Sequence, residues 1–223
     1  SATPSLLAKW LKSENAHSLE TKRLANRTRE MLKLSHEEYR KMLSLLRKRI
    51  NIVERLMSEN RWDEIEFDKI PSKAGLIYKN AFARRDIIKA KYEKFAKDKT
   101  TKVNAGTLYP YEIVEKAINL MQSNYWNNNV IALDNTDRLM INKYWDNITN
   151  YFNGSSLNAL CMVDTSASMR GTPINVAISL GLYCAEKAGG PFAGHYISFS
   201  SYPQLIETSG VDFCDKVDRI VST

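Results

Sequence analysis

The chain has 223 residues, 43% of them hydrophobic, and 32 Lys and Arg against 25 Asp and Glu, which gives a net charge of +7. This length allows one large or two small domains, and the apolar fraction is enough to form a buried core. No apolar run reaches the roughly 18 residues that a membrane-spanning helix needs, so we expect no membrane partner.

The first 150 residues are expected to be α-helical. Ser35 and Glu38 have the spacing of a capping box, which marks a helix start. Apolar residues at spacings of three and four then predict a long amphipathic helix. With the other cap signals, the expected helices cover residues 5–11, 19–32, 35–57, 71–82, 86–97, 111–121 and the second half of 128–145. Short helices in succession are compatible with a helical-repeat stack.

The charge is unevenly divided along the chain. Residues 1–150 hold 28 Lys and Arg against 19 Asp and Glu, whereas residues 151–223 hold 4 against 6. A polar, turn-forming segment at 151–156 marks the change, so we predict a basic helical domain, 1–150, and a second domain, 151–223. Basic residues in the first domain form a candidate nucleic-acid face: Arg23, Arg27, Arg47, Lys48, Arg49, Arg84 and Arg85. The alternative interpretation is a set of solvated helix faces.

The second domain has the pattern of a strand–helix–strand unit. An apolar strand is expected at 159–163, and a helix with Thr172 as its N-cap and Pro173 as its first residue comes next. A second strand is expected at 195–199, adjacent and parallel to the first. The residues predicted to be buried together are Leu160, Met162, Val163, Ile178, Leu182, Ile197 and Phe199.

A candidate metal-binding motif follows the first of these strands. Asp164, Ser166 and Ser168 alternate along the loop where ligands bind in open α/β sheets, beyond the carboxyl end of a strand. One carboxylate and two hydroxyls are hard oxygen ligands, which suit Mg²⁺. The alternative interpretation is a turn in which these side chains only cap the backbone. Three cysteines without metal-ligand spacing predict reduced thiols and a cytoplasmic location.

This motif resembles the metal-ion-dependent adhesion site (MIDAS) of von Willebrand factor A domains. The blocks 53–58, 62–65, 70–74 and 103–113 resemble a poorly characterised family that joins an α-helical N-terminal domain to a von Willebrand A-like domain. More distantly, the layout resembles the Ro autoantigen (TROVE) family, in which helical repeats carry an A-type domain and bind RNA.

The resemblance implies a Rossmann-like α/β fold for residues 151–223, incomplete because two later ligand loops would follow residue 223. It implies Mg²⁺, or Mn²⁺ or Ca²⁺, at Asp164, Ser166 and Ser168. It also implies a non-enzymatic binding or scaffold protein, in which an acidic residue of a protein partner completes the metal site. Two alternatives stay open: RNA binding by the basic helical domain, and a metal-dependent phosphoryl-transfer enzyme.

Overall fold

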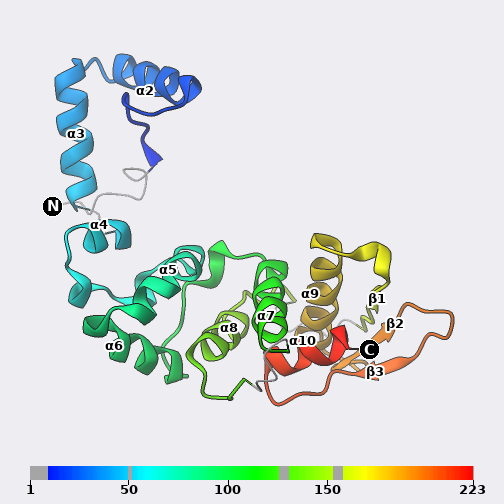
Figure 1. Ribbon diagram of the computed structural model, residues 1–223. Coiled ribbons are helices and arrows are strands. Elements are labelled where there is room, and N and C mark those ends of the chain that lie inside the picture. Colours follow the sequence, from blue (N-terminus) through cyan, green and yellow to red (C-terminus); the bar gives the residue numbers. More distant parts are fainter. Residues whose placement is uncertain (1–9, 50–51, 126–130, 153–157, 223) are drawn as a thin grey trace. The chain divides into compact units, whose positions relative to one another are not determined.

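The computed structural model describes residues 10–49, 52–125, 131–152 and 158–222. They are mostly helical, with a small three-stranded mixed sheet near the C-terminus (Figure 1). The chain divides into two compact units, residues 1–65 and residues 66–223. Across the described ranges, no helix combines the length and the apolar character that crossing a bilayer requires.

The first unit contains α2 (Leu19–Met31), α3 (His36–Arg49), α4 (Val53–Ser58) and the short 3₁₀ helix η1 (Trp62–Glu64). The predicted capping box is confirmed. The Ser35 backbone N–H donates to Glu38 Oε2 at 2.8 Å, and the Glu38 N–H donates to Ser35 Oγ at 3.2 Å. Ala25 of α2 packs with Tyr39 and Leu43 of α3, so one apolar stripe on each helix forms the core between them.

The prediction of one helix over 35–57 was wrong. Helix α3 ends at Arg49 and α4 begins at Val53, because Ile52 has an extended backbone with φ −73° and ψ 148°. The predicted apolar spacing continues across the break, since Val53 is buried and Met57 is partly buried. The basic last turn of α3, residues 47–49, suits the negative end of a helix dipole and marks the true end. The helix expected at 5–11 lies almost entirely outside the described residues.

The first four α-helices of the second unit begin close to the predicted positions. Their bounds are α5 (Ser72–Arg84), α6 (Asp86–Lys97), α7 (Pro110–Tyr125) and α8 (Thr136–Asp146); η2 (Phe67–Lys69) precedes α5, and η3 (Ala105–Thr107) lies between α6 and α7. Phe67, Phe82 and Tyr92 form an aromatic core, with ring centroids 5.1 to 5.6 Å apart.

A strand–helix–strand unit follows. Strand β1 (Met162–Val163) pairs in parallel with β2 (His195–Ser198), and α9 (Thr172–Lys187) connects them. The adjacent, parallel strands are therefore confirmed. Strand β3 (Leu205–Glu207) pairs antiparallel to β2, and α10 (Phe213–Val221) follows. The observed sheet has the order β1-β2-β3.

Only part of the predicted core of this unit is buried. Val163, Ile178 and Leu182 are buried, but Met162 is 57% exposed and Phe199 is 56% exposed. Leu160 and Ile197 are partly exposed. The prediction was wrong for Met162 and Phe199 because side chains alternate between the two faces of a sheet. Val163 lies against Gly181 of α9, whereas Met162 points to the opposite face, where its cross-strand neighbour is Ile197, which pairs in turn with Leu205 of β3.

Helices from both sides of residue 150 share one core. Helix α7 lies beside α9 and α10 (Figure 1). The Trp145 ring of α8 stacks on Phe213 of α10 with centroids 4.1 Å apart. The Tyr183 hydroxyl of α9 donates to the Thr149 carbonyl at 2.8 Å. The second compact unit thus extends across the 150/151 boundary expected from composition.

Gly181 marks the closest approach of α9 to β1. A Cβ at this position would lie 2.3 Å from Val163 Cγ2, too close for van der Waals contact. We therefore expect Gly181→Ala to lower the free energy of unfolding by about 1–3 kcal/mol through overpacking, measured by urea denaturation. Gly106→Ala is the matched control, because its Cβ would meet only Asn104 Oδ1 at 3.7 Å. Equal effects of the two substitutions would contradict this packing.

Candidate functional site

The predicted metal ligands lie on the loop that leaves β1 and leads into α9. Asp164 is partly buried, and Ser166 and Ser168 are exposed. Asp164 Oδ1 accepts the Ser166 backbone N–H at 2.9 Å. The Ser166 and Ser168 hydroxyl oxygens are 3.0 Å apart. The fold therefore brings the two hydroxyls together on the short loop that begins at the carboxylate.

The helix after this loop starts differently from the prediction. Gly171 is the N-cap residue with φ 86°, α9 begins at Thr172, and no side chain caps it. Thr172 is therefore not the N-cap, and Pro173 lies one position further into the first turn. Glycine suits this turn because side chains disfavour positive φ values. Within the loop, residues Ala167–Met169 form the short 3₁₀ helix η4.

The oxygen donors of this loop are of the type that binds a hard cation, but only one of them is a carboxylate. Within the described ranges, no three His, Cys, Asp or Glu side chains gather as potential metal ligands. A metal here would therefore depend on the serine hydroxyls. The predicted ligand set left out Ser200 and Ser201, which lie on the loop after β2. The Phe199 N–H donates to the Val163 carbonyl at 2.9 Å, so the loop after β2 leaves the sheet beside Asp164.

The predicted basic face is divided between the two compact units. Arg84 and Arg85 belong to residues 66–223, and the other five predicted residues belong to residues 1–65. Arg23 and Arg27 are exposed on α2. Arg47 and Lys48 line a pocket, whereas Arg49 does not. The structure thus brings together two of the seven predicted residues in one concave site.

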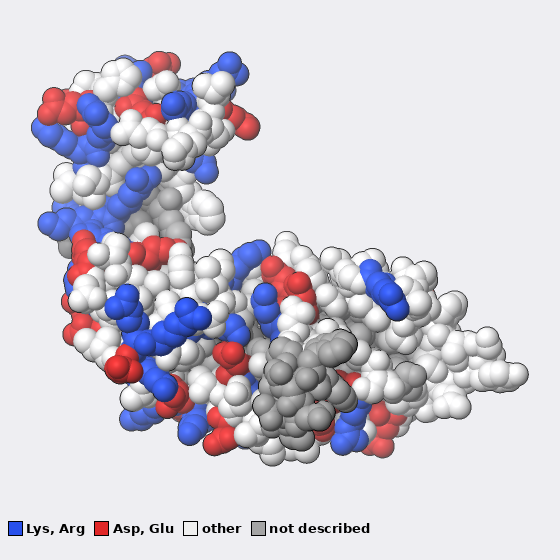
Figure 2. All heavy atoms as spheres, viewed as in Figure 1, with Lys and Arg blue, Asp and Glu red and all other residues white. Residues whose placement is uncertain are grey.

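This pocket in the first unit has a volume of about 400 Å³. Its lining is Ser13, Arg40, Leu43, Ser44, Arg47, Lys48, Arg55 and Glu59. Lys and Arg side chains gather over α3 in Figure 2. The seven residues selected from the sequence did not include Arg40 or Arg55. The signal for Arg40 was its spacing, since positions 40, 44, 47 and 48 share one face of a helix.

The one carboxylate of the pocket is already paired. Glu59 Oε1 accepts from Arg55 Nε at 2.6 Å, and Glu59 Oε2 lies 2.8 Å from Arg61 Nη1. These hydrogen bonds from Arg55 and Arg61 hold the pKa of Glu59 below its ordinary value. Glu59 is therefore ionised at neutral pH, and its charge is balanced by two guanidinium groups.

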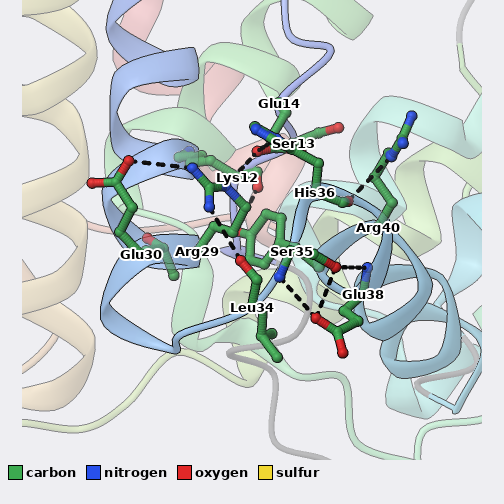
Figure 3. Close-up of polar contacts among 12 residues, drawn as sticks. Lys12, Ser13, Glu14, Arg29, Glu30, Leu34, Ser35, His36, Glu38 and Arg40 are labelled. Atoms are coloured by element: carbon green, nitrogen blue, oxygen red, sulfur yellow. Dashed lines mark hydrogen bonds and ion pairs between the residues drawn. The ribbon is translucent and has the colours of Figure 1, made fainter.

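Hydrogen bonds hold the segment before α2 against the helices of the pocket (Figure 3). Glu14 Oε1 lies 3.1 Å from Arg29 Nε and 2.8 Å from His36 Nδ1. The Tyr39 hydroxyl donates to the Lys12 carbonyl at 2.9 Å. Arg47 Nη2 donates to the Leu11 carbonyl at 3.0 Å. Ser13 is thereby fixed as one wall of the pocket.

Comparisons with known proteins give two family models and a viral relative. Residues 4–155 match the model "Domain of unknown function (DUF2828)", and residues 158–223 match "Domain of unknown function (DUF7788)". An uncharacterized protein of Acanthamoeba polyphaga mimivirus is 33% identical over 230 residues, which cover 96% of this chain. The matched region is 38% of that relative's length. No solved structure matches the chain. Since the first model covers more than half of its residues, the chain belongs to the DUF2828 family.

Proposed function

We propose that the chain is a non-enzymatic binding protein whose loop 164–168 holds Mg²⁺. The observation that carries this proposal is the 3.0 Å separation of the Ser166 and Ser168 hydroxyl oxygens on the loop that starts at Asp164. The loop follows the carboxyl end of a strand with a parallel neighbour, where α/β folds bind ligands. Mn²⁺ or Ca²⁺ would find the same hard oxygen donors.

The donor set leaves room for a partner in the metal's coordination shell. Asp164, Ser166 and Ser168 supply three donor side chains, one carboxylate and two hydroxyls, whereas Mg²⁺ prefers six ligands in octahedral geometry and commonly retains several waters. A carboxylate from another protein can replace one of these waters. In this proposal the partner is a protein with an exposed acidic residue, and the helical remainder of the chain serves as the scaffold.

Substitution of the single carboxylate tests the metal site. We expect Asp164→Ala to weaken Mn²⁺ binding at least tenfold, measured by electron paramagnetic resonance of free Mn²⁺, because it removes the only anionic donor. Ser166→Ala combined with Ser168→Ala is expected to weaken binding in the same direction. Asp134→Ala is the control, because Asp134 is an exposed carboxylate outside this loop. Equal Mn²⁺ affinity of wild type and Asp164→Ala would contradict the assignment.

Binding of a carboxylate through the metal is a separate measurement. Fluorescent peptides that each contain one Asp or Glu are titrated with the chain, first in Mg²⁺ and then in EDTA, and their binding is measured. The proposal expects binding that requires Mg²⁺ and disappears with Asp164→Ala. Binding that persists in EDTA would show that the partner does not use the metal.

A further inference from the structure

We propose that the pocket on α3 in the first compact unit binds a phosphate-bearing ligand. Its lining comes from residues 13–59, whereas the proposed metal loop belongs to the other unit. The two proposals are therefore independent and can fail separately.

The charge of the pocket favours an anion. Four of its lining residues are cationic, Arg40, Arg47, Lys48 and Arg55, against the single carboxylate of Glu59. Arg55 and Arg61 already neutralise Glu59, with nitrogen–oxygen distances of 2.5 and 2.8 Å. Arg40, Arg47 and Lys48 are left as like charges on one helix face, an arrangement that a bound anion stabilises.

Hydrogen-bond donors remain available on these three side chains. Among the described residues, Lys48 has no hydrogen-bond or ion-pair partner. Arg40 uses Nε to donate to the His36 carbonyl at 3.2 Å, and Arg47 uses Nη2 to donate to the Leu11 carbonyl at 3.0 Å. The other guanidinium N–H groups and the hydroxyl of Ser44 can donate to phosphate oxygens. Guanidinium groups suit such oxygens because their N–H groups form bidentate pairs with them.

The size and the rigidity of the pocket are consistent with a phosphate-bearing ligand. A volume of about 400 Å³ falls within the range of small-molecule sites, larger than one phosphate needs. The pocket therefore has room for a ligand with a further group, such as a second phosphate or a nucleoside. The bonds of Arg47 to Leu11 and of Tyr39 to Lys12 hold two walls in place before binding, which lowers the entropic cost of association.

Two sources can supply this chemistry, a free phosphorylated small molecule and the backbone of single-stranded RNA. Arg40, Ser44 and Lys48 are exposed, so the rim is open to either one. The test titrates the 223-residue chain with pyrophosphate, with ATP and with a labelled oligouridine, each at two salt concentrations. Salt dependence is expected in every case, and it should be steepest for RNA, because each neutralised phosphate releases counterions.

Charge-removing variants locate the binding. We expect Arg40→Gln combined with Lys48→Gln to weaken binding at least tenfold. Arg49→Gln is the matched control, since it removes a charge from the same helix outside the pocket lining. It should weaken binding less than twofold. Circular dichroism confirms that each variant remains folded.

The outcomes distinguish the two ligand sources and also test the proposal. Pocket-dependent binding of pyrophosphate or ATP assigns a small phosphorylated ligand. Pocket-dependent binding of oligouridine alone assigns an RNA backbone phosphate. The proposal is overturned if none of the three probes binds at millimolar concentration. It is equally overturned if Arg49→Gln weakens binding as much as the pocket variants do, because the attraction would then be a diffuse charge effect.

Discussion

Arg138→Met is expected to lower the free energy of unfolding by about 3–5 kcal/mol, because it leaves the carboxylate of Asp212, whose side chain is 18% exposed, without its counter-charge. Arg138 is 5% exposed, and its Nε and Nη2 donate to the two oxygens of Asp212 at 2.7 and 2.8 Å. Asn142 Nδ2 donates to the same carboxylate at 2.8 Å. Urea denaturation measures the loss.

Asp212 also caps α10, so the rescue variant has to keep an N-cap. Its side chain accepts the Asp215 backbone N–H at 2.9 Å. Asp212→Asn preserves this cap and removes the charge. We expect Arg138→Met combined with Asp212→Asn to recover part of the lost stability. The control is Arg219→Met on α10, where the exposed pair with Asp215 contributes about 1 kcal/mol or less. The prediction fails if the buried and exposed arginine substitutions cost the same.

The same ion pair predicts a pH dependence. Burial would raise the pKa of Asp212, but hydrogen bonds from Arg138, the Asp215 N–H and Asn142 outweigh it and hold the pKa below its ordinary value. A carboxyl with a lowered folded-state pKa stabilises the fold above its unfolded pKa of about 3.9 and loses this contribution as the pH falls through the folded value. The stability difference between wild type and Arg138→Met should therefore shrink below about pH 4.

Trp145→Ala is expected to cost about 3–5 kcal/mol, since it removes a large side chain from a closed core. Trp145 is 1% exposed and stacks on Phe213 at 4.1 Å. Its Nε1 donates to Glu186 Oε2 at 2.6 Å, and Lys216 Nζ lies 2.6 Å from the other oxygen of that carboxylate. The loss should appear as a lower thermal midpoint, by about 2–4 °C for each kcal/mol.

Two variants separate the contributions of Trp145. Trp145→Phe keeps most of the packing and removes the donor to Glu186, so we expect about 1–3 kcal/mol. Trp10→Ala should change stability by less than about 0.5 kcal/mol, because Trp10 is 66% exposed. A Trp145→Ala variant as stable as Trp10→Ala would contradict the packing of α8 on α10.

Local signals in the sequence predicted the helices well. Residues 86–97 form α6 as expected, and the capping box at Ser35 has the expected hydrogen bonds. These features depend on residues a few positions apart, which a sequence shows directly. The break at Ile52 was missed because the apolar spacing continues through it, so periodicity alone could not locate the end of α3.

Features that depend on contacts between residues far apart in the chain could not be predicted from the sequence. The Arg138–Asp212 pair joins positions 74 residues apart, and nothing local marks either one as buried. The apolar character of Met162 and Phe199 predicted burial, but only the sheet and the position of α9 decide which face is covered. For the candidate sites, the Asp164 motif was readable as one loop. The pocket could not be predicted in this way, because Ser13 reaches it from the segment before α2 and Arg55 reaches it from α4.

The packing of α7 and α8 on α9 and α10 affects how this chain can be divided in evolution or by engineering. The two matched family models meet between residues 155 and 158, inside the compact unit of residues 66–223. A recombination event at this junction would separate Trp145 from Phe213 and Arg138 from Asp212. Both fragments would then expose to water apolar surface that is buried in the intact unit. We therefore expect a chimaera that exchanges one of these segments to fold only when its counterpart is exchanged as well.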